Sequence, residues 1–137
     1  MPHAAQIQKL TRFAFAALVV LLLAACAAAP TRTDTDAFFV LKEGRIAPTS
    51  VRAFTDCLLD GFDKAHFVLT NSTSRQQRRT DSFRVETLGG GRIITISADV
   101  FDDGRVVLNE SKSAALINTS GQREAFDRCQ AQYSATK

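Results

Sequence analysis

The stretch that decides the fold is IITISADVFDDGRVVLNE, residues 93–110. Apolar residues alternate with polar ones along its first half, at Ile94, Ile96, Ala98 and Val100. A period of two is typical of a β-strand that buries one face. Asp102, Asp103 and Gly104 then form a tight turn into a second apolar run at 105–110. This stretch therefore predicts an antiparallel β-hairpin.

Two more strands are expected before the hairpin, at residues 66–70 and 82–88. The second of them alternates through Phe83, Val85 and Thr87. Residues 89–91 are all glycine, but they lack the spacing of a dinucleotide-binding loop and the lysine of a phosphate-binding loop. We interpret them as a turn or a β-bulge. The predicted sheet has three or four antiparallel strands.

One helix is predicted before the strands in the sequence, and a second helix after them. The first begins near residue 49 or 50 and ends at Gly61, and the second begins after residue 119 or 120 and runs through residue 132. Each has an apolar stripe: Val51, Phe54, Leu58 and Phe62 in the first, and Ala125, Phe126, Cys129 and Tyr133 in the second. A single stripe is typical of a helix that covers a core. The predicted fold class is α+β, a two-layer sandwich in the order helix, strands, helix, with both helices on one face of the sheet.

The N-terminal region has the parts of an export signal. Lys9 and Arg12 form a positive segment, and residues 13–23 form an apolar core. The region ends in Leu23, Ala24, Ala25 and Cys26. This arrangement resembles the signal of bacterial lipoproteins. The resemblance implies that a diacylglyceryl group is attached to Cys26, that residues 1–25 are removed, and that lipid holds the mature chain in a membrane.

Two other interpretations of this region stay open. An uncleaved transmembrane helix needs about 20 apolar residues, whereas this stretch is alanine-rich and ends at Pro30. An ordinary secretory cleavage site fits Ala27 and Ala29, but Pro30 would then follow the cleaved bond. The lipoprotein signal fits the residues better than either.

The resemblance also implies a location. In lipoproteins of double-membraned bacteria, aspartate directly after the acylated cysteine tends to retain the protein at the inner membrane, and this chain has Ala27 there. The expected location is the outer membrane, facing the periplasm, and display at the cell surface stays open. We divide the chain into a signal peptide (1–25), a lipidated N-terminus with a tether (26–47) and one small domain (48–137). Residues 37–41 are either a short strand or a segment that docks on the domain.

Two cysteines remain once Cys26 is assigned to lipid. Cys57 lies at the edge of the first apolar stripe and Cys129 lies within the second, 72 residues later. In an oxidising compartment such a pair is expected to form a disulfide, which would join the two helices. Two buried free thiols, or a metal-binding or nucleophilic cysteine, are the alternatives.

The charge balance argues against nucleic acid as a partner. The chain has 17 basic and 14 acidic residues, and removal of the signal takes away Lys9 and Arg12. The mature chain is then close to neutral, whereas a nucleic-acid-binding domain is strongly basic overall or on one face.

The reactive side chains form no catalytic or metal-binding pattern. His66 is the one histidine that remains after maturation, and no serine or cysteine at a useful spacing completes a triad with it. Asp99, Asp102 and Asp103 lack the ligand spacing of a calcium loop. We therefore expect no metal, no cofactor and no enzyme activity.

One polar segment is a candidate contact surface. Residues 71–81 are predicted to be a loop, and their Arg75, Arg78 and Arg79 have the chemistry to contact lipid phosphate, an anionic glycan or an acidic envelope protein. An ordinary solvated hairpin loop has the same composition, so that alternative stays open.

Three classes of function follow, in order of preference. The first is a non-enzymatic envelope lipoprotein, attached to membrane lipid through Cys26, that acts as a structural or binding module. The second is a periplasmic ligand-binding or inhibitory module that uses the sheet face left uncovered by the helices, and the third is an envelope enzyme. We expect Thr95, Ser97 and Asp99 on the uncovered face, and a polar face argues against an apolar-ligand pocket there.

Overall fold

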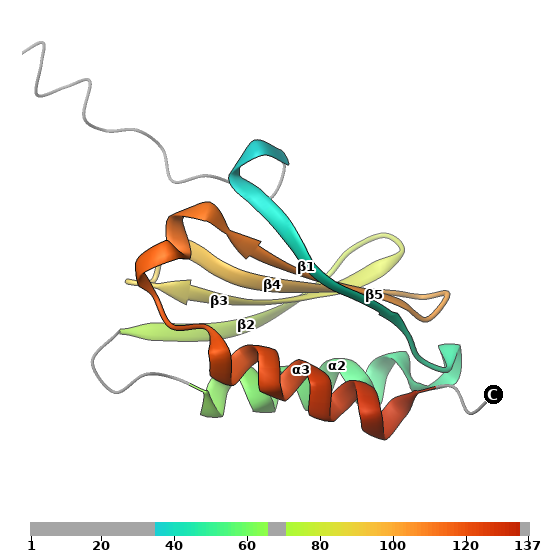
Figure 1. The fold of residues 1–137 in the computed structure, drawn as a ribbon. Coiled ribbons are helices and arrows are strands. Elements are labelled where there is room, and N and C mark those ends of the chain that lie inside the picture. The colour runs from blue at the N-terminus through green and yellow to red at the C-terminus, as the bar shows by residue number, and fades with distance from the viewer. Residues whose placement is uncertain (1–34, 66–70, 135–137) are drawn as a thin grey trace, which may run out of the picture.

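The computed structural model describes residues 35–65 and 71–134 (Figure 1). Their elements are η1 (Thr35–Ala37), β1 (Phe38–Arg45), η2 (Pro48–Ser50), α2 (Val51–Lys64), β2 (Ser72–Arg78), β3 (Ser82–Gly89), β4 (Ile93–Phe101), β5 (Arg105–Ser111), η3 (Lys112–Leu116) and α3 (Ser120–Tyr133). Both α-helices lie on the same face of one sheet (Figure 1). The predicted α+β two-layer fold is therefore confirmed.

Antiparallel pairing brings the first residues of three strands and the last residues of the other two to the same end of the sheet. The order is β1-β5-β4-β3-β2, and all neighbours are antiparallel. The first residues of β1, β4 and β2 therefore lie at the same end of the sheet as the last residues of β3 and β5. Because η3 follows β5 directly there, we call this end of the sheet the η3 end.

The core lies between the sheet and the two helices. Its fully buried large side chains come from both layers: Phe54, Leu58, Phe62 and Phe126 from the helices, and Val85, Ile96, Val100, Val106 and Leu108 from the sheet. The Phe54 ring meets Phe126 and Tyr133 edge-on, with centroids 6.1 and 6.2 Å apart. The predicted apolar stripes thus face the core.

β4 and β5 form the predicted hairpin. Ala98 lies opposite Leu108, and both are buried on the helix side of the sheet. Gly104 in the turn has a φ of 85°, and a Cβ there would lie 2.3 Å from the carbonyl oxygen of Ile46. Only glycine fits both conditions. The Ile46 N–H donates to the Gly104 carbonyl at 2.9 Å, which holds the segment between β1 and α2 against the turn.

The sheet contains two strands, β1 and β2, that alternation of apolar residues did not predict. Residues 71–81 contain β2, so the prediction of a loop there is wrong. β2 shows no apolar alternation because it is an edge strand that pairs with β3 through its backbone and through polar contacts, such as Ser74 Oγ to Thr87 Oγ1 at 3.1 Å. The strand predicted at residues 66–70 lies outside the described residues.

β1 is the other additional strand. It pairs with β5 from Phe38, opposite Ser111, to Arg45, opposite Arg105. The strand interpretation of residues 37–41 is therefore correct, and the strand continues to Arg45. Because this segment belongs to the sheet, the folded part of the chain includes residues that the division at 48 placed in the tether.

The helices follow their predicted limits with one difference. α3 has the expected extent, whereas α2 continues through Gly61 to Lys64. A Cβ at Gly61 would lie 2.7 Å from the Cβ of Ala125, so this glycine allows the two helices to pack closely. The cost of glycine within a helix, about 1 kcal/mol relative to alanine, is offset by that packing.

Candidate functional site

A pocket with a volume of about 320 Å³ lies at the η3 end. Its wall is mainly apolar, and its described residues come from the starts of β2 and β4, the end of β3 and the turn after it, the segment that joins η3 to α3, and the first turn of α3. They include Thr87, Gly89, Ile93, Thr95, Ile117 and Gln122. Ligand pockets in proteins commonly measure about 300–1,000 Å³, so this one is large enough for a small organic molecule.

The connection between β3 and β4 forms one side of the pocket. Gly90 and Gly91 have φ values of 58° and 71°, in the left-handed region that glycine adopts freely. The predicted turn at residues 89–91 is therefore confirmed. Gly89, just before the turn, has no side chain to fill the space that Ile117 borders.

A β-bulge adds Thr95 to the same wall. Leu88 lies opposite Ile94 and Thr87 lies opposite Ile96, so Thr95 is an extra residue between the two pairs. Its hydroxyl donates to the Thr87 carbonyl at 3.1 Å. The alternation that predicted Thr95 beside Ser97 is interrupted here, and Thr95 lines the pocket instead.

An ion pair holds the opposite wall, where the chain enters α3. Glu110, near the end of β5, is 7% exposed and accepts hydrogen bonds from Arg123 Nη2 at 2.6 and 2.7 Å. It also accepts one from the hydroxyl of Thr119, the N-cap residue of α3. The Thr119 side chain makes no capping hydrogen bond to the helix. Glu110 thus fixes the start of α3 to the sheet.

Gln122 lines the pocket, and its side chain contains a buried polar atom without a partner in the part of the chain that the structure describes. The residue is 5% exposed, and its Oε1 is buried with no hydrogen-bond partner among the described residues. An unsatisfied buried acceptor costs about 1–3 kcal/mol, and such groups are rare in native structures. Because Oε1 has almost no accessible surface, a bound molecule can donate a hydrogen bond to it, and recover that free energy, once the Gln122 side chain turns this atom toward the cavity.

The pocket has the chemistry of a binding site. Its described lining residues are apolar, glycine, hydroxyl or amide residues, none of which titrates near neutral pH. Its volume is about twice that of the roughly 150 Å³ apolar cavity that accepts benzene. The wall therefore suits an apolar molecule of about ten carbon atoms with one hydrogen-bond donor.

The three arginines predicted as a contact surface do not form one group. Arg75 lies in β2 opposite Glu86, and its Nε donates to Glu86 Oε1 at 2.6 Å. The Glu86 side chain is only 2% exposed, so Arg75 neutralises a buried carboxylate. Arg75 therefore has a structural role within the sheet.

Arg78 pairs with Asp102, which lies in the turn between β4 and β5. It makes two hydrogen bonds to Asp102 at 2.7 and 2.8 Å, and its guanidinium lies 4.5 Å from the centre of the Phe83 ring. Arg79 lies in the turn after β2, where its N–H donates to the Ser82 carbonyl at 2.8 Å. Arg78 also serves the packing of the sheet.

The exposed pair of Arg78 and Asp102 should govern how Asp102 titrates. The hydrogen bond from Arg78 lowers the pKa of Asp102 below its ordinary value of 3.8. A lowered carboxyl pKa adds stability above the unfolded-state value, and this contribution disappears as the pH falls through the folded-state pKa. The contribution is small because the pair is exposed. We expect Arg78→Gln to raise the Asp102 pKa to its ordinary range and Arg79→Gln, the matched control, to leave it unchanged. Carboxyl NMR titration measures both, and an unshifted pKa in Arg78→Gln would contradict the pairing.

The aspartates considered as a cation site each have a separate partner. Asp99 pairs with Arg84, Asp102 pairs with Arg78, and Asp103 accepts a hydrogen bond from the Arg105 N–H at 2.9 Å. In residues 35–65 and 71–134, no group of three or more His, Cys, Asp or Glu side chains is placed to hold a metal ion.

The sheet face that the helices leave uncovered carries buried polar side chains and two ion pairs among the described residues. Ser97 and Asp99 are 0% and 6% exposed. Arg84 Nε donates to Asp99 at 2.6 Å, and Arg75 pairs with Glu86 on the neighbouring strand. The polarity expected at Ser97 and Asp99 is confirmed, and the apolar pocket lies at the end of the sheet rather than on this face.

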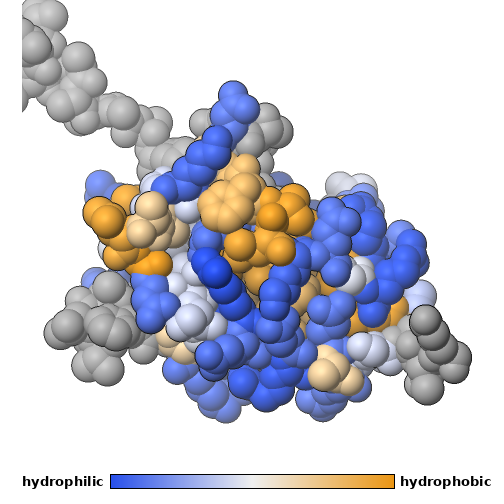
Figure 2. Space-filling view, in the orientation of Figure 1, coloured by the Kyte–Doolittle hydropathy of each residue, from blue (hydrophilic) through white to orange (hydrophobic). Residues whose placement is uncertain are grey.

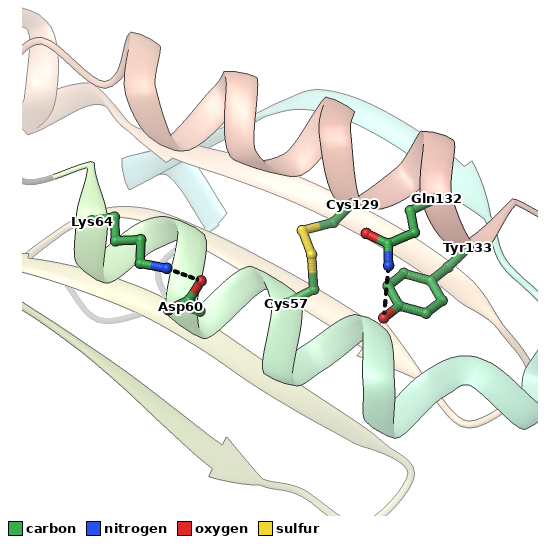
Figure 3. The surroundings of a disulfide bond; sticks show 6 residues. All are labelled: Cys57, Asp60, Lys64, Cys129, Gln132 and Tyr133. Carbon is green, nitrogen blue, oxygen red and sulfur yellow. Dashed lines mark hydrogen bonds and ion pairs between the residues drawn. A yellow bond between two sulfur atoms is a disulfide. The ribbon is translucent and has the colours of Figure 1, made fainter.

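Cys57 and Cys129 form the predicted disulfide (Figure 3). Their sulfur atoms are 1.99 Å apart and their Cα atoms 6.0 Å apart. The bond joins α2 to α3, and Cys129 is fully buried. Figure 3 also shows the Lys64 contact to Asp60, at 2.7 Å, one turn along α2 from Cys57. The disulfide holds both helices on the same face of the sheet.

Cys26 and His66 lie outside the described residues, so their predicted roles stay predictions. Among the helices that the structure describes, none is both long and apolar enough to cross a membrane.

Comparison of the chain with models of known protein families, with curated proteins and with solved structures yields no match.

Prediction from the sequence missed the pocket. Its residues come from five segments, the last of them α3 with Gln122, and no short motif joins them. One usable signal was Ile93, an apolar residue directly after the glycine run that breaks the alternation beginning at Ile94. Gln122 gave no signal, because a glutamine in the first turn of a helix is ordinary.

Proposed function

We propose that this chain is a lipid-anchored protein of the bacterial envelope and that its domain is a non-enzymatic binding module. The binding site is the pocket at the η3 end. The observation that carries this proposal is the buried, unpartnered Oε1 of Gln122 in a mainly apolar cavity of about 320 Å³. The anchoring is supported by the lipoprotein signal that ends at Cys26.

The ligand class follows from the wall. An apolar body replaces water along Ile93 and Ile117, at a gain of about 25 cal/mol for each Å² that is buried. One donor group pairs with Gln122 Oε1. A molecule without the donor leaves the acceptor unsatisfied and binds more weakly.

Two matched probes test the site: 2-naphthol and naphthalene, which differ by a single hydroxyl. Binding is measured as the ligand-dependent rise in the unfolding temperature of the mature protein in detergent. We expect 2-naphthol to bind the unsubstituted protein about tenfold more tightly than naphthalene, because one satisfied acceptor contributes about 1.4 kcal/mol.

Gln122→Met should remove this preference and leave naphthalene binding nearly unchanged, since it keeps the volume of the side chain but removes the acceptor. Gln132→Met, on the exposed side of the same helix, is the matched control and should keep the preference. Failure of both probes to bind would contradict the pocket as a binding site, and an equal preference in Gln122→Met and the unsubstituted protein would contradict the role of Gln122.

A further inference from the structure

The large apolar side chains that are exposed in the described part of the chain gather at the η3 end. They are Phe39, Val40, Ile93 and Leu116, with exposed fractions of 42%, 52%, 39% and 99%. Phe39 and Val40 lie near the start of β1, Ile93 is the first residue of β4, and Leu116 is the last residue of η3. Figure 2 shows apolar surface over β1 and over the part of the molecule where η3 lies. Exposed apolar residues scattered singly are common, but gathering at one end indicates a contact surface.

Two cations lie among these apolar residues. Arg92 directly precedes Ile93, and Lys112 lies in η3 with Leu116. Both are exposed, and neither has an ion-pair partner among the described residues. Asp36 in η1 is an exposed acidic residue on the β1 side, so the balance of these three charges is positive. Apolar side chains flanked by cations complement the interface of a bilayer with anionic lipids.

The chain also enters the domain at this end. Thr35, the first described residue, precedes β1, and the start of β1 lies at the η3 end. Cys26 comes only nine positions before Thr35. Even a fully extended segment of that length spans about 30 Å, so an acyl group on Cys26 keeps the η3 end close to the membrane.

We infer that the η3 end docks on the anionic phospholipid bilayer in which the acylated Cys26 is held. This inference rests on the proposed anchoring. A diacylglyceryl group carries two acyl chains and already holds the chain stably in the membrane, so the apolar surface with its cations orients the tethered domain on the bilayer rather than supplying the anchor. Because Ile93 belongs both to this surface and to the pocket wall, docking brings the pocket to the lipid surface.

A tryptophan reporter tests the docking, because the chain contains no tryptophan of its own. Leu116→Trp places a single fluorophore at the η3 end. Thr80→Trp places one at the exposed turn between β2 and β3, at the opposite end of the sheet, and is the matched control. Each full-length protein is acylated in cells and reconstituted into vesicles of phosphatidylethanolamine and phosphatidylglycerol whose acyl chains carry bromine, a contact quencher.

The inference predicts that Leu116→Trp loses most of its emission and shifts to the blue, while Thr80→Trp keeps the emission of a solvated residue. Emission from Leu116→Trp that matches Thr80→Trp, in protein shown by mass spectrometry to be acylated, would overturn the docking but not the anchoring. Absence of the acyl group in the mass spectrum would overturn the anchoring itself, and the docking inference with it.

Discussion

Cys26→Ser is expected to abolish lipid attachment and to leave a larger precursor. The thiol of Cys26 is the acceptor that the lipoprotein signal implies, and a serine hydroxyl is a far weaker nucleophile than a thiolate at neutral pH. Without the lipid, cleavage before residue 26 should also fail, so residues 1–25 stay on the chain. Gel mobility and metabolic labelling with a radioactive fatty acid measure both effects.

The matched control is the double variant Cys57→Ser with Cys129→Ser. It removes the other two cysteines of the chain and keeps the signal intact, so it should incorporate the fatty acid as the unsubstituted protein does. Unsubstituted protein that carries no label and is released in soluble form would contradict the anchor. Label that persists in Cys26→Ser would show that the lipid is attached elsewhere.

The parts of the fold that could be predicted are those with a strong local pattern. The alternation from Ile94 to Val100 and the turn at Gly104 correctly gave the hairpin, because burial of one sheet face imposes a period of two. The apolar stripes correctly gave both helices. The disulfide could be predicted because those stripes placed Cys57 and Cys129 where two neighbouring helices can meet.

β2 could not be predicted because its sequence, STSRQQR, has no apolar residue. What holds it in the sheet is backbone pairing with β3, together with side-chain contacts such as that of Arg75 with Glu86, eleven residues later. A contact between residues so far apart in the sequence leaves no local pattern from which the strand could be predicted. The partner of Arg78 is also distant in the sequence, since Arg78 pairs with Asp102, 24 residues later.

The pocket could not be predicted because it depends on two departures from regular structure. The bulge moves Thr95 out of the alternation, and the Thr119 hydroxyl donates to Glu110 while its oxygen makes no capping hydrogen bond to α3. Both features are set by tertiary contacts, which a local sequence pattern does not show. Gln122 is unusual only because the fold buries its side chain beside the pocket, whereas a glutamine on an exposed helix face would be solvated.

Loss of the disulfide should have the largest effect on stability. The double variant Cys57→Ala with Cys129→Ala is expected to lower the free energy of unfolding by about 2–5 kcal/mol. The bond closes a loop of 72 residues, and it therefore restricts the unfolded chain strongly, by about 4 kcal/mol in the chain-entropy model. Replacing both cysteines avoids leaving a lone thiol in the fully buried position of Cys129. Urea unfolding followed by far-ultraviolet circular dichroism gives the free energy.

Reduced protein with both cysteines in place separates the cross-link from the packing of the sulfur atoms. It keeps the sulfur atoms in the core but frees the unfolded chain, so it should show most of the loss seen in the double variant. The slope of the free energy against urea should also rise in both, because an unfolded chain without the cross-link exposes more surface. If reduction leaves the midpoint unchanged, the link contributes little to stability, and the cost of the alanine variant reflects lost packing between α2 and α3. Free thiols in protein isolated from the cells that make it would contradict the disulfide directly.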